Sequence, residues 1–201
     1  YTIVLSAFLH GAETNTFFAP FFICWLDFSY LKTIYSTVWA FAALKNDGTV
    51  FSWGKTRDAA ENIVTPAELT DVDNGIENPV REIFTTESAF VALRNDCTVV
   101  AWGDENDGGI IPSGFDVSYV KTVYSTARAF AALDYNNEVV AWGDEDYGGT
   151  VTSGLDVTNV EAIYSTAKAF AALKQKGSQV TWGYKKKEEK EKKEKEKKKI
   201  K

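Results

Sequence analysis

The chain has 201 residues with a formal net charge of −6, and it contains two cysteines and one histidine. The cysteines, Cys24 and Cys97, are isolated in the sequence, which excludes a disulfide framework. Residues 1–184 carry 11 basic and 23 acidic side chains, whereas residues 185–201 carry 11 lysines and 5 glutamates. The acidic body argues against nucleic acid as its partner and leaves only the lysine-rich tail able to attract phosphates.

Residues 1–25 form an N-terminal segment that lacks the repeated motifs of the rest of the chain. Its two apolar stretches, at 3–9 and 17–26, are shorter than the roughly 20 residues needed to cross a bilayer. No basic residue precedes the first stretch, which argues against a signal peptide. We expect either an irregular apolar cap over the first repeat or a chain whose missing front held further repeats.

A block of the type Ala-Phe-Ala-Ala-Leu occurs four times, each time nine residues before a Trp-Gly pair. The blocks begin at residues 40, 89, 129 and 169, so they are 49, 40 and 40 residues apart. A fixed period near 40 residues indicates an array of equivalent structural units. We place these units at about 26–65, 66–115, 116–155 and 156–184.

Each unit has the pattern of three short β-strands, shown best by the third copy. Residues 120–126 are rich in β-branched and aromatic side chains, and two further apolar runs follow at 129–133 and 139–142. The turn at 45–48 of the first copy, Lys-Asn-Asp-Gly, favours a tight hairpin because its residues tolerate positive φ. Cys97 takes the place of Gly48 in the second copy and fits such a position poorly.

The second strand of each unit is apolar on both faces, which is typical of a strand covered on two sides. Its alanines allow neighbouring sheets to approach closely, as they do around the axis of a β-propeller. We therefore predict an all-β, propeller-type repeat array with four blades, and a solenoid is the competing architecture. Eight repeated aromatic residues are expected to be buried between the units: Phe41, Trp53, Phe90, Trp102, Phe130, Trp142, Phe170 and Trp182.

The motif around the Trp-Gly pair resembles a known repeat family. Residues 46–54 read Asn-Asp-Gly-Thr-Val-Phe-Ser-Trp-Gly, and residues 142–149 read Trp-Gly-Asp-Glu-Asp-Tyr-Gly-Gly. This pattern resembles the regulator-of-chromosome-condensation repeat and the three-stranded blades of the propeller-type β-lactamase inhibitory proteins, over roughly residues 26–184. The resemblance implies propeller blades, and because such rings typically close with about seven blades, four blades imply an open or partial propeller.

The longer spacing between the first two copies places an insertion within residues 55–79, a polar stretch with Pro66 and Pro79 as breakers. Insertions in repeat proteins map to loops on one face, often the binding face. The alternative is a surface insertion that the fold simply tolerates.

Two acidic loops recur after the second and third Trp-Gly pairs, and we expect them to form an acidic rim that binds a basic protein surface. The expected binding residues are Asp104, Glu105, Asp107, Asp144, Glu145 and Asp146. The loops resemble the opening of a calcium loop, but Phe115 and Leu155 stand where its bidentate glutamate is required, so we expect no metal.

Catalysis finds little support in the sequence. The single histidine, His10, lies outside the repeats, and no catalytic triad can be assembled from them. The Gly-Gly pairs at 108–109 and 148–149 lack the Gly-Lys-Ser/Thr of a phosphate-binding loop. We therefore predict a protein that is not an enzyme and needs no cofactor.

The tail at 185–201 places lysine four residues after glutamate four times, which supports a marginal helix at most. A solvated tail, a nuclear-localisation-like or anion-binding segment, and a segment that folds back on the acidic body all remain open. We expect an intracellular, non-catalytic protein-interaction module that can also self-associate through open blade edges. The resemblance implies two alternatives, nucleotide exchange on a small GTPase and inhibition of an enzyme.

Overall fold

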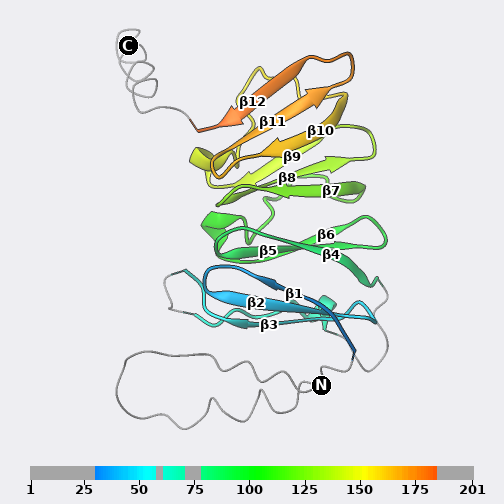
Figure 1. The fold of residues 1–201 in the computed structure, drawn as a ribbon, viewed down its shortest axis with the longest axis vertical. Helices are drawn as coiled ribbons and strands as arrows, with labels where there is room; N and C mark the ends of the chain where they lie inside the picture. The colour runs from blue at the N-terminus through cyan, green and yellow to red at the C-terminus, as the bar shows by residue number, and fades with distance from the viewer. Residues whose placement is uncertain (1–29, 58–60, 71–77, 185–201) are drawn as a thin grey trace.

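The structure is a computed structural model that describes residues 30–57, 61–70 and 78–184. These residues form four three-stranded antiparallel sheets, and each sheet contains three strands that are consecutive in the chain (Figure 1). The all-β, propeller-type array of four blades is therefore confirmed. The predicted segments at 1–25 and 185–201, with His10 and Cys24, lie outside the described residues.

We call the four sheets blades 1 to 4. Blade 1 contains β1 (Leu31–Ser36), β2 (Ala40–Lys45) and β3 (Val50–Gly54), and blade 2 contains β4 (Val80–Thr85), β5 (Ala89–Arg94) and β6 (Val99–Gly103). Blade 3 contains β7 (Val120–Ser125), β8 (Ala129–Asp134) and β9 (Val139–Gly143), and blade 4 contains β10 (Val160–Ser165), β11 (Ala169–Lys174) and β12 (Gln179–Gly183). Three 3₁₀ turns lie in the connections: η3 (Ala67–Leu69), η4 (Glu105–Asp107) and η5 (Glu145–Tyr147).

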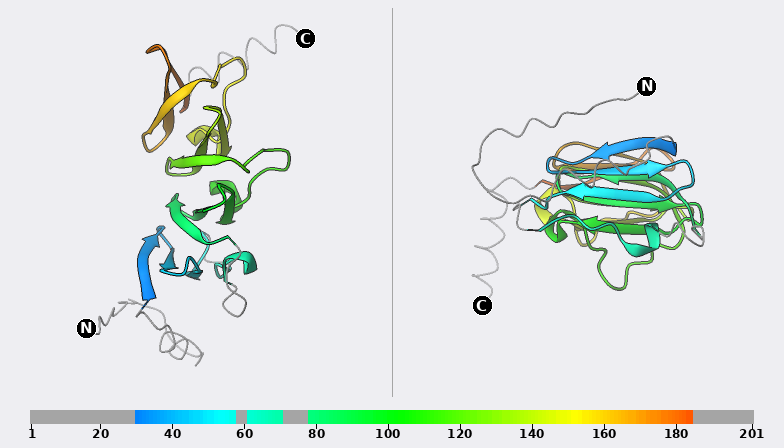
Figure 2. Two further views of the ribbon diagram at one scale, coloured as in Figure 1. Left: turned by 90° about the vertical axis from the view of Figure 1, so that its right-hand side faces the viewer. Right: turned by 90° about the horizontal axis from the view of Figure 1, so that it is seen from below.

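The blades are stacked in chain order, with blade 1 and blade 4 at opposite ends (Figures 1 and 2). The first strands of neighbouring blades, β1, β4, β7 and β10, approach one another most closely. Within the described part of the chain the stack does not return to its first blade, so the array is open.

Blades 2, 3 and 4 each pack their aromatic face on the alanine-rich face of the blade before them. Phe130 and Trp142 of blade 3 lie in one apolar cluster with Ala89, Val91 and Leu93 of blade 2. Phe170 and Trp182 repeat this arrangement against blade 3. Alanine in the middle strand keeps the receiving face shallow, so a phenylalanine ring fits between two sheets. This explains why the second strand is apolar on both faces.

Phe41 departs from the expected burial of the repeated aromatics, because it is 42% exposed while Phe90 and Phe130 are fully buried. Phe41 occupies the same place in blade 1 and stacks on Trp53 at 5.4 Å between ring centroids. No described blade lies against that face, so these rings remain half open. Trp102, Trp142 and Trp182 are buried, as expected for packing between blades.

Backbone hydrogen bonds join the blades at a repeated position. The turn between the first and second strands donates an N–H to the same turn of the next blade, from Val38 to Glu87 at 2.9 Å and from Glu87 to Ala127 at 2.8 Å. Ala127 continues the series to Ala167 at 3.0 Å. The blades are therefore in register with one another as well as packed.

The hairpins between the second and third strands have a residue with positive φ at the position of Gly48, as the turn sequence predicts. Gly48 has φ of 85°, and Cys97 and Asn137 adopt 70° and 64° at the same position. Cys97 thus keeps the repeated turn in spite of its side chain, a conformation that is unfavourable for most residues other than glycine and asparagine.

Candidate protein-binding surface

The two acidic loops leave β6 and β9 and form the 3₁₀ turns η4 and η5, which lie along the same side of the stack (Figure 1). The first carboxylate of each loop caps its turn. Asp104 Oδ1 accepts a hydrogen bond from the Asn106 N–H at 3.0 Å, and Asp144 Oδ1 accepts one from the Asp146 N–H at 2.8 Å. Each turn ends at a glycine in the left-handed region, which only glycine adopts without strain.

The acidic side chains of these loops differ in exposure. Glu105, Glu145 and Asp146 are exposed, whereas Asp104 and Asp144 are half-buried by their capping role. We use the name acidic rim for these five carboxylates. The two loops lie on successive blades, so the rim presents negative charge twice along one side of the array.

Asp107 does not belong to this rim, because its side chain is fully buried and forms an ion pair with Arg57. Arg57 comes from the connection that follows blade 1, so the pair fastens that connection to blade 2. The sequence spacing placed Asp107 with the exposed acids, but its position at the end of η4 turns it inward. The position holds Tyr147 in the next blade, which is only partly buried.

Basic residues accompany the acidic rim, and the sequence analysis did not single them out. Arg128 Nε lies 3.5 Å from Glu87 Oε2, and Arg128 Nη1 lies 3.8 Å from Asp144 Oδ2. The guanidinium carbon lies 4.9 Å from the centre of the Tyr147 ring. Lys168 lies over the same ring at 5.3 Å. Both residues immediately precede an Ala-Phe-Ala-Ala-Leu block, at the position that Trp39 holds in blade 1. A comparison of this position among the repeats would have found them.

The glycines of the same loops let each connection close onto the next blade. Trp142 Nε1 donates to the Gly108 carbonyl at 3.0 Å, and Trp182 Nε1 donates to the Gly148 carbonyl at the same distance. A Cβ on Gly108 would lie 2.7 Å from the Phe130 ring. The Gly-Gly pairs therefore serve packing between blades, which agrees with their lack of a phosphate-binding pattern.

Among the described residues, no group of three or more histidine, cysteine, aspartate or glutamate side chains is placed to hold a metal ion. In the same part of the chain, no helix is long and apolar enough to span a membrane.

Four other carboxylates serve the turns rather than the rim. Hydrogen bonds from the Ser118 side chain and backbone lower the pKa of Asp116, and those from Lys174 and Thr158 lower the pKa of Asp156. Burial acts to raise the pKa of Asp47 and Asp96, but hydrogen bonds from the following threonines outweigh it and the pKa of each is lowered. These aspartates stay ionised and hold their turns at neutral pH.

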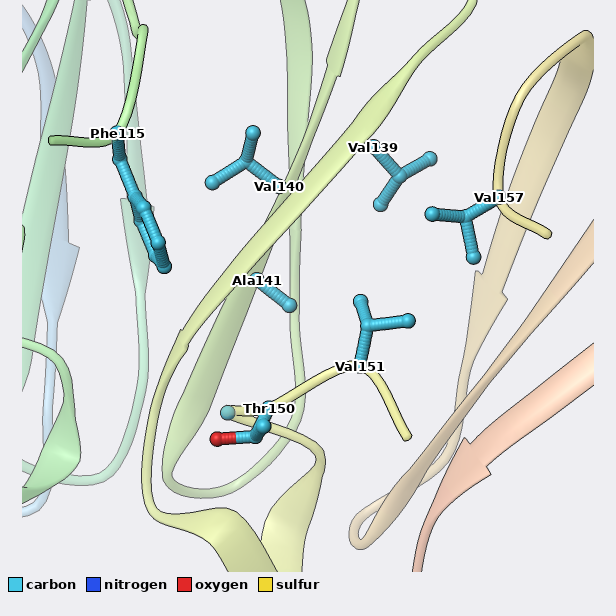
Figure 3. Close-up of a pocket in the computed structure, with 8 residues that line it drawn as sticks. Phe115, Val139, Val140, Ala141, Thr150, Val151 and Val157 are labelled. Atoms are coloured by element: carbon cyan, nitrogen blue, oxygen red, sulfur yellow. The ribbon is translucent and has the colours of Figure 1, made fainter. Parts of the chain in front are cut away.

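A cavity of about 290 Å³ lies beside β9 (Figure 3). Val139, Val140 and Ala141 form its inner wall, and Phe115, Val151 and Val157 approach from the two neighbouring connections. Gly149 and Thr150 complete the lining. The site is apolar apart from the Thr150 hydroxyl and the backbone, so its chemistry suits hydrophobic side chains rather than ions.

The corresponding edge of blade 1 is covered by the chain itself. Ser52 N–H donates to Thr65 Oγ1 at 2.7 Å, and Ile63 N–H donates to the Gly54 carbonyl at 3.2 Å. An antiparallel bridge between Lys55 and Asn62 completes the contact. Part of the insertion therefore runs along β3, where the sequence had left open a binding loop or a tolerated surface insertion.

No protein-family model and no curated protein matches this chain. Solved structures match its fold. Prp20p from Saccharomyces cerevisiae is 20% identical with a TM-score of 0.53, over 76% of this chain and 43% of Prp20p. The ectodomain of the receptor kinase CR4 from Physcomitrella patens is 17% identical with a TM-score of 0.51, over 76% of this chain and 40% of the ectodomain.

Human WBSCR16 is 19% identical with a TM-score of 0.50, over 78% of this chain and 48% of WBSCR16. At these identities the matches show the fold, an RCC1-like propeller, since Prp20 is yeast RCC1. The chain spans less than half of the length of each of these three proteins.

Proposed function

We propose that this chain is a non-catalytic protein-interaction module whose acidic rim binds a basic surface of a partner protein. The observation that carries the proposal is the recurrence of exposed acids at one place on blades 2 and 3, at Glu105, Glu145 and Asp146. Clustered charge of one sign speeds the encounter with an oppositely charged protein. Prp20p, which shares the fold, binds Gsp1p and histones.

Arg128 modulates the rim without neutralising it. Its guanidinium is shared between Glu87 and Asp144, and it also lies against Tyr147. Glu105 and Glu145 extend beyond these contacts into solvent. An incoming lysine or arginine therefore meets the carboxylates of Glu105 and Glu145, which Arg128 does not pair with.

The test is association with histones of a variant in which Glu105, Glu145 and Asp146 become Gln, Gln and Asn. We expect association at low salt to slow by about tenfold, with a smaller loss at 0.15 M salt where screening is stronger. A matched variant changes the exposed glutamates Glu82, Glu138 and Glu161 to Gln, which removes the same net charge elsewhere. Equal slowing in both variants would contradict a role for the rim itself.

Nucleotide exchange on a small GTPase is a second candidate, because the resemblance of the repeats implies it and the structurally similar Prp20p binds Gsp1p. A nucleotide-release assay with a candidate GTPase tests it directly. Faster release in the presence of the chain would favour this function over simple binding. Inhibition of an enzyme, an intracellular location and self-association through open blade edges remain predictions.

A further inference from the structure

The two ends of the described array are faces of different kinds (Figures 1 and 2). Blade 1 turns its alanine-rich face toward blade 2, so its aromatic face points out of the stack. In blade 4, Phe170 and Trp182 point toward blade 3. Side chains alternate between the two faces of a strand, so Ala169, Ala171 and Leu173 point away from blade 3. The two ends are therefore the two halves of the contact that joins neighbouring blades inside the array.

The end face of blade 4 is open where the same face of blade 3 is closed. Ala169, Ala171 and Leu173 are only partly buried, while the residues at the same positions of blade 3 are buried beneath Phe170. Tyr164 pairs with Ala171 in the ladder, lies on the same face and is 63% exposed. The shallow surface that receives a phenylalanine ring elsewhere in the array is thus accessible at this end.

The end face of blade 1 carries the complementary rings. Phe41 is 42% exposed and stacks on Trp53, which is half-buried. Ile34 lies on the same face and is 40% exposed, although Val123 at its position in blade 3 is buried. Contiguous exposed apolar side chains mark an interaction surface. This surface has the composition of the faces that blades 2, 3 and 4 bury against the blade before them.

The backbone hydrogen bonds between blades stop at these two faces. Val38, Glu87 and Ala127 each donate an N–H to the carbonyl of the same turn in the next blade, and Ala167 accepts the last of these bonds. Among the described residues, no hydrogen bond uses the Ala167 N–H or the Val38 carbonyl. The series therefore ends with an unused donor at blade 4 and an unused acceptor at blade 1.

A second series has the same ends. The first strand of blade 2 donates an N–H to the hairpin of blade 1, from Val80 to the Gly48 carbonyl at 3.1 Å, and blades 3 and 4 repeat this bond. Leu31 holds the position of Val80 in blade 1, and Gly177 holds the position of Gly48 in blade 4. Both series would continue if the face of blade 1 packed on the face of blade 4 in another copy.

We propose that two copies of this chain associate head to tail, with the aromatic face of blade 1 in one copy packed on the alanine-rich face of blade 4 in the other. Phe41 of the first copy lies over Ala171 of the second, whose Ala167 N–H donates to the Val38 carbonyl of the first. The contact repeats the packing between neighbouring blades, and it uses the end faces rather than the blade edges. Such a heterologous contact closes into a ring or adds further copies.

The test is sedimentation velocity of the full chain over a concentration series, with one substitution in each face. Phe41→Lys and Ala171→Lys place a charge at residues that are already partly exposed. We expect the unsubstituted chain to associate as its concentration rises. Each variant alone should raise the dissociation constant by more than about tenfold, because its lysine is buried without a counterion. Ile110→Lys, at an exposed residue between blades 2 and 3, is the matched control and should associate normally.

A mixture of the two variants tests the head-to-tail arrangement. The Phe41→Lys chain keeps an intact face on blade 4, and the Ala171→Lys chain keeps an intact face on blade 1. An equimolar mixture should therefore form one-to-one pairs and nothing larger. If like faces paired instead, one of the two variants would still associate by itself, and the proposal would be wrong.

The proposal is also overturned if the unsubstituted chain stays monomeric up to about 1 mM, or if the mixed variants do not pair. Urea unfolding of the dilute variants shows whether they are folded. If one is not, hydrogen exchange at Ala167 of the unsubstituted chain gives a second reading, since it should slow as the concentration rises, and unchanged exchange contradicts the contact. Neutralising Glu105, Glu145 and Asp146 should leave association intact, so this contact and the acidic rim can fail separately.

Discussion

Blades 1 and 3 are built from the same three strands, but only blade 3 has its aromatic face covered by another described blade. Blade 3 has its aromatic face closed by blade 2, and the connection that follows β9 packs Val151, Leu155 and Val157 against that strand. Blade 1 has its aromatic face open at Phe41, and its outer edge at β3 is closed by residues 62–65. The strands therefore define the blade, and the presence of a neighbouring blade decides whether its aromatic face is buried.

The largest effect should come from the aromatic faces. Phe130→Ala should lower the free energy of unfolding by about 3–5 kcal/mol, because the ring is fully buried between two blades and its loss leaves a cavity. Phe41→Ala should cost about 1 kcal/mol, since solvent already reaches that ring. Urea unfolding of both variants measures the difference, and equal losses would show that the face of blade 1 is covered after all.

The connection that follows blade 1 should depend on the ion pair between Arg57 and Asp107. Arg57→Ala leaves the carboxylate of Asp107 buried without a counterion and should destabilise the fold by about 3 kcal/mol. Adding Asp107→Asn should recover part of the loss, because the uncompensated charge is gone. Thermal unfolding of the single and double variants gives the coupling, and independent, additive effects would contradict the pairing.

Opening the edge of blade 1 should have a smaller effect. Thr65→Val removes the acceptor of the Ser52 N–H and should cost about 1 kcal/mol. Hydrogen exchange at Ser52 should accelerate, while exchange at the amides of blade 3 should stay the same. If Ser52 exchange does not change, the segment at 62–65 is not what protects this edge.

The repeat period and the apolar middle strand were enough to predict the number of blades, their strands and the burial of Phe90, Phe130 and Phe170. They did not predict that Phe41 is exposed, because burial of a repeated residue depends on the neighbouring blade and not on its own motif. The same limit applies to Asp107, which has acidic neighbours in sequence but is buried against the half-buried Arg57 in space.

The basic residues of the rim were missed for a different reason. Arg128 and Lys168 occupy the position just before the repeated block, and this position differs among the repeats, since Trp39 and Ser88 also occur there. Their contribution becomes visible only when the loops of neighbouring blades are brought together.

The smallest effect should be a loss of stability in acid. Hydrogen bonds from Ser118 lower the pKa of Asp116, which precedes blade 3, and hydrogen bonds from Thr49 lower the pKa of Asp47 in blade 1 against the effect of burial. A pKa lowered by folding contributes stability above the unfolded value of 3.8, and this contribution is lost as the pH falls through the folded pKa. Ser118→Ala should reduce the acid dependence, measured as the slope of stability below about pH 4. A variant with the unchanged slope would show that Asp116 does not contribute.

The proposed function is tested most directly by binding of a chain that lacks residues 185–201 to histones and to duplex DNA over a salt series. Residues 1–184 carry 11 basic and 23 acidic side chains, so the shortened chain retains the acidic rim without the lysine-rich tail. We predict binding to histones that weakens as salt is raised, and no measurable binding to DNA. Tight DNA binding by the shortened chain, or histone binding that does not depend on salt, would contradict the account.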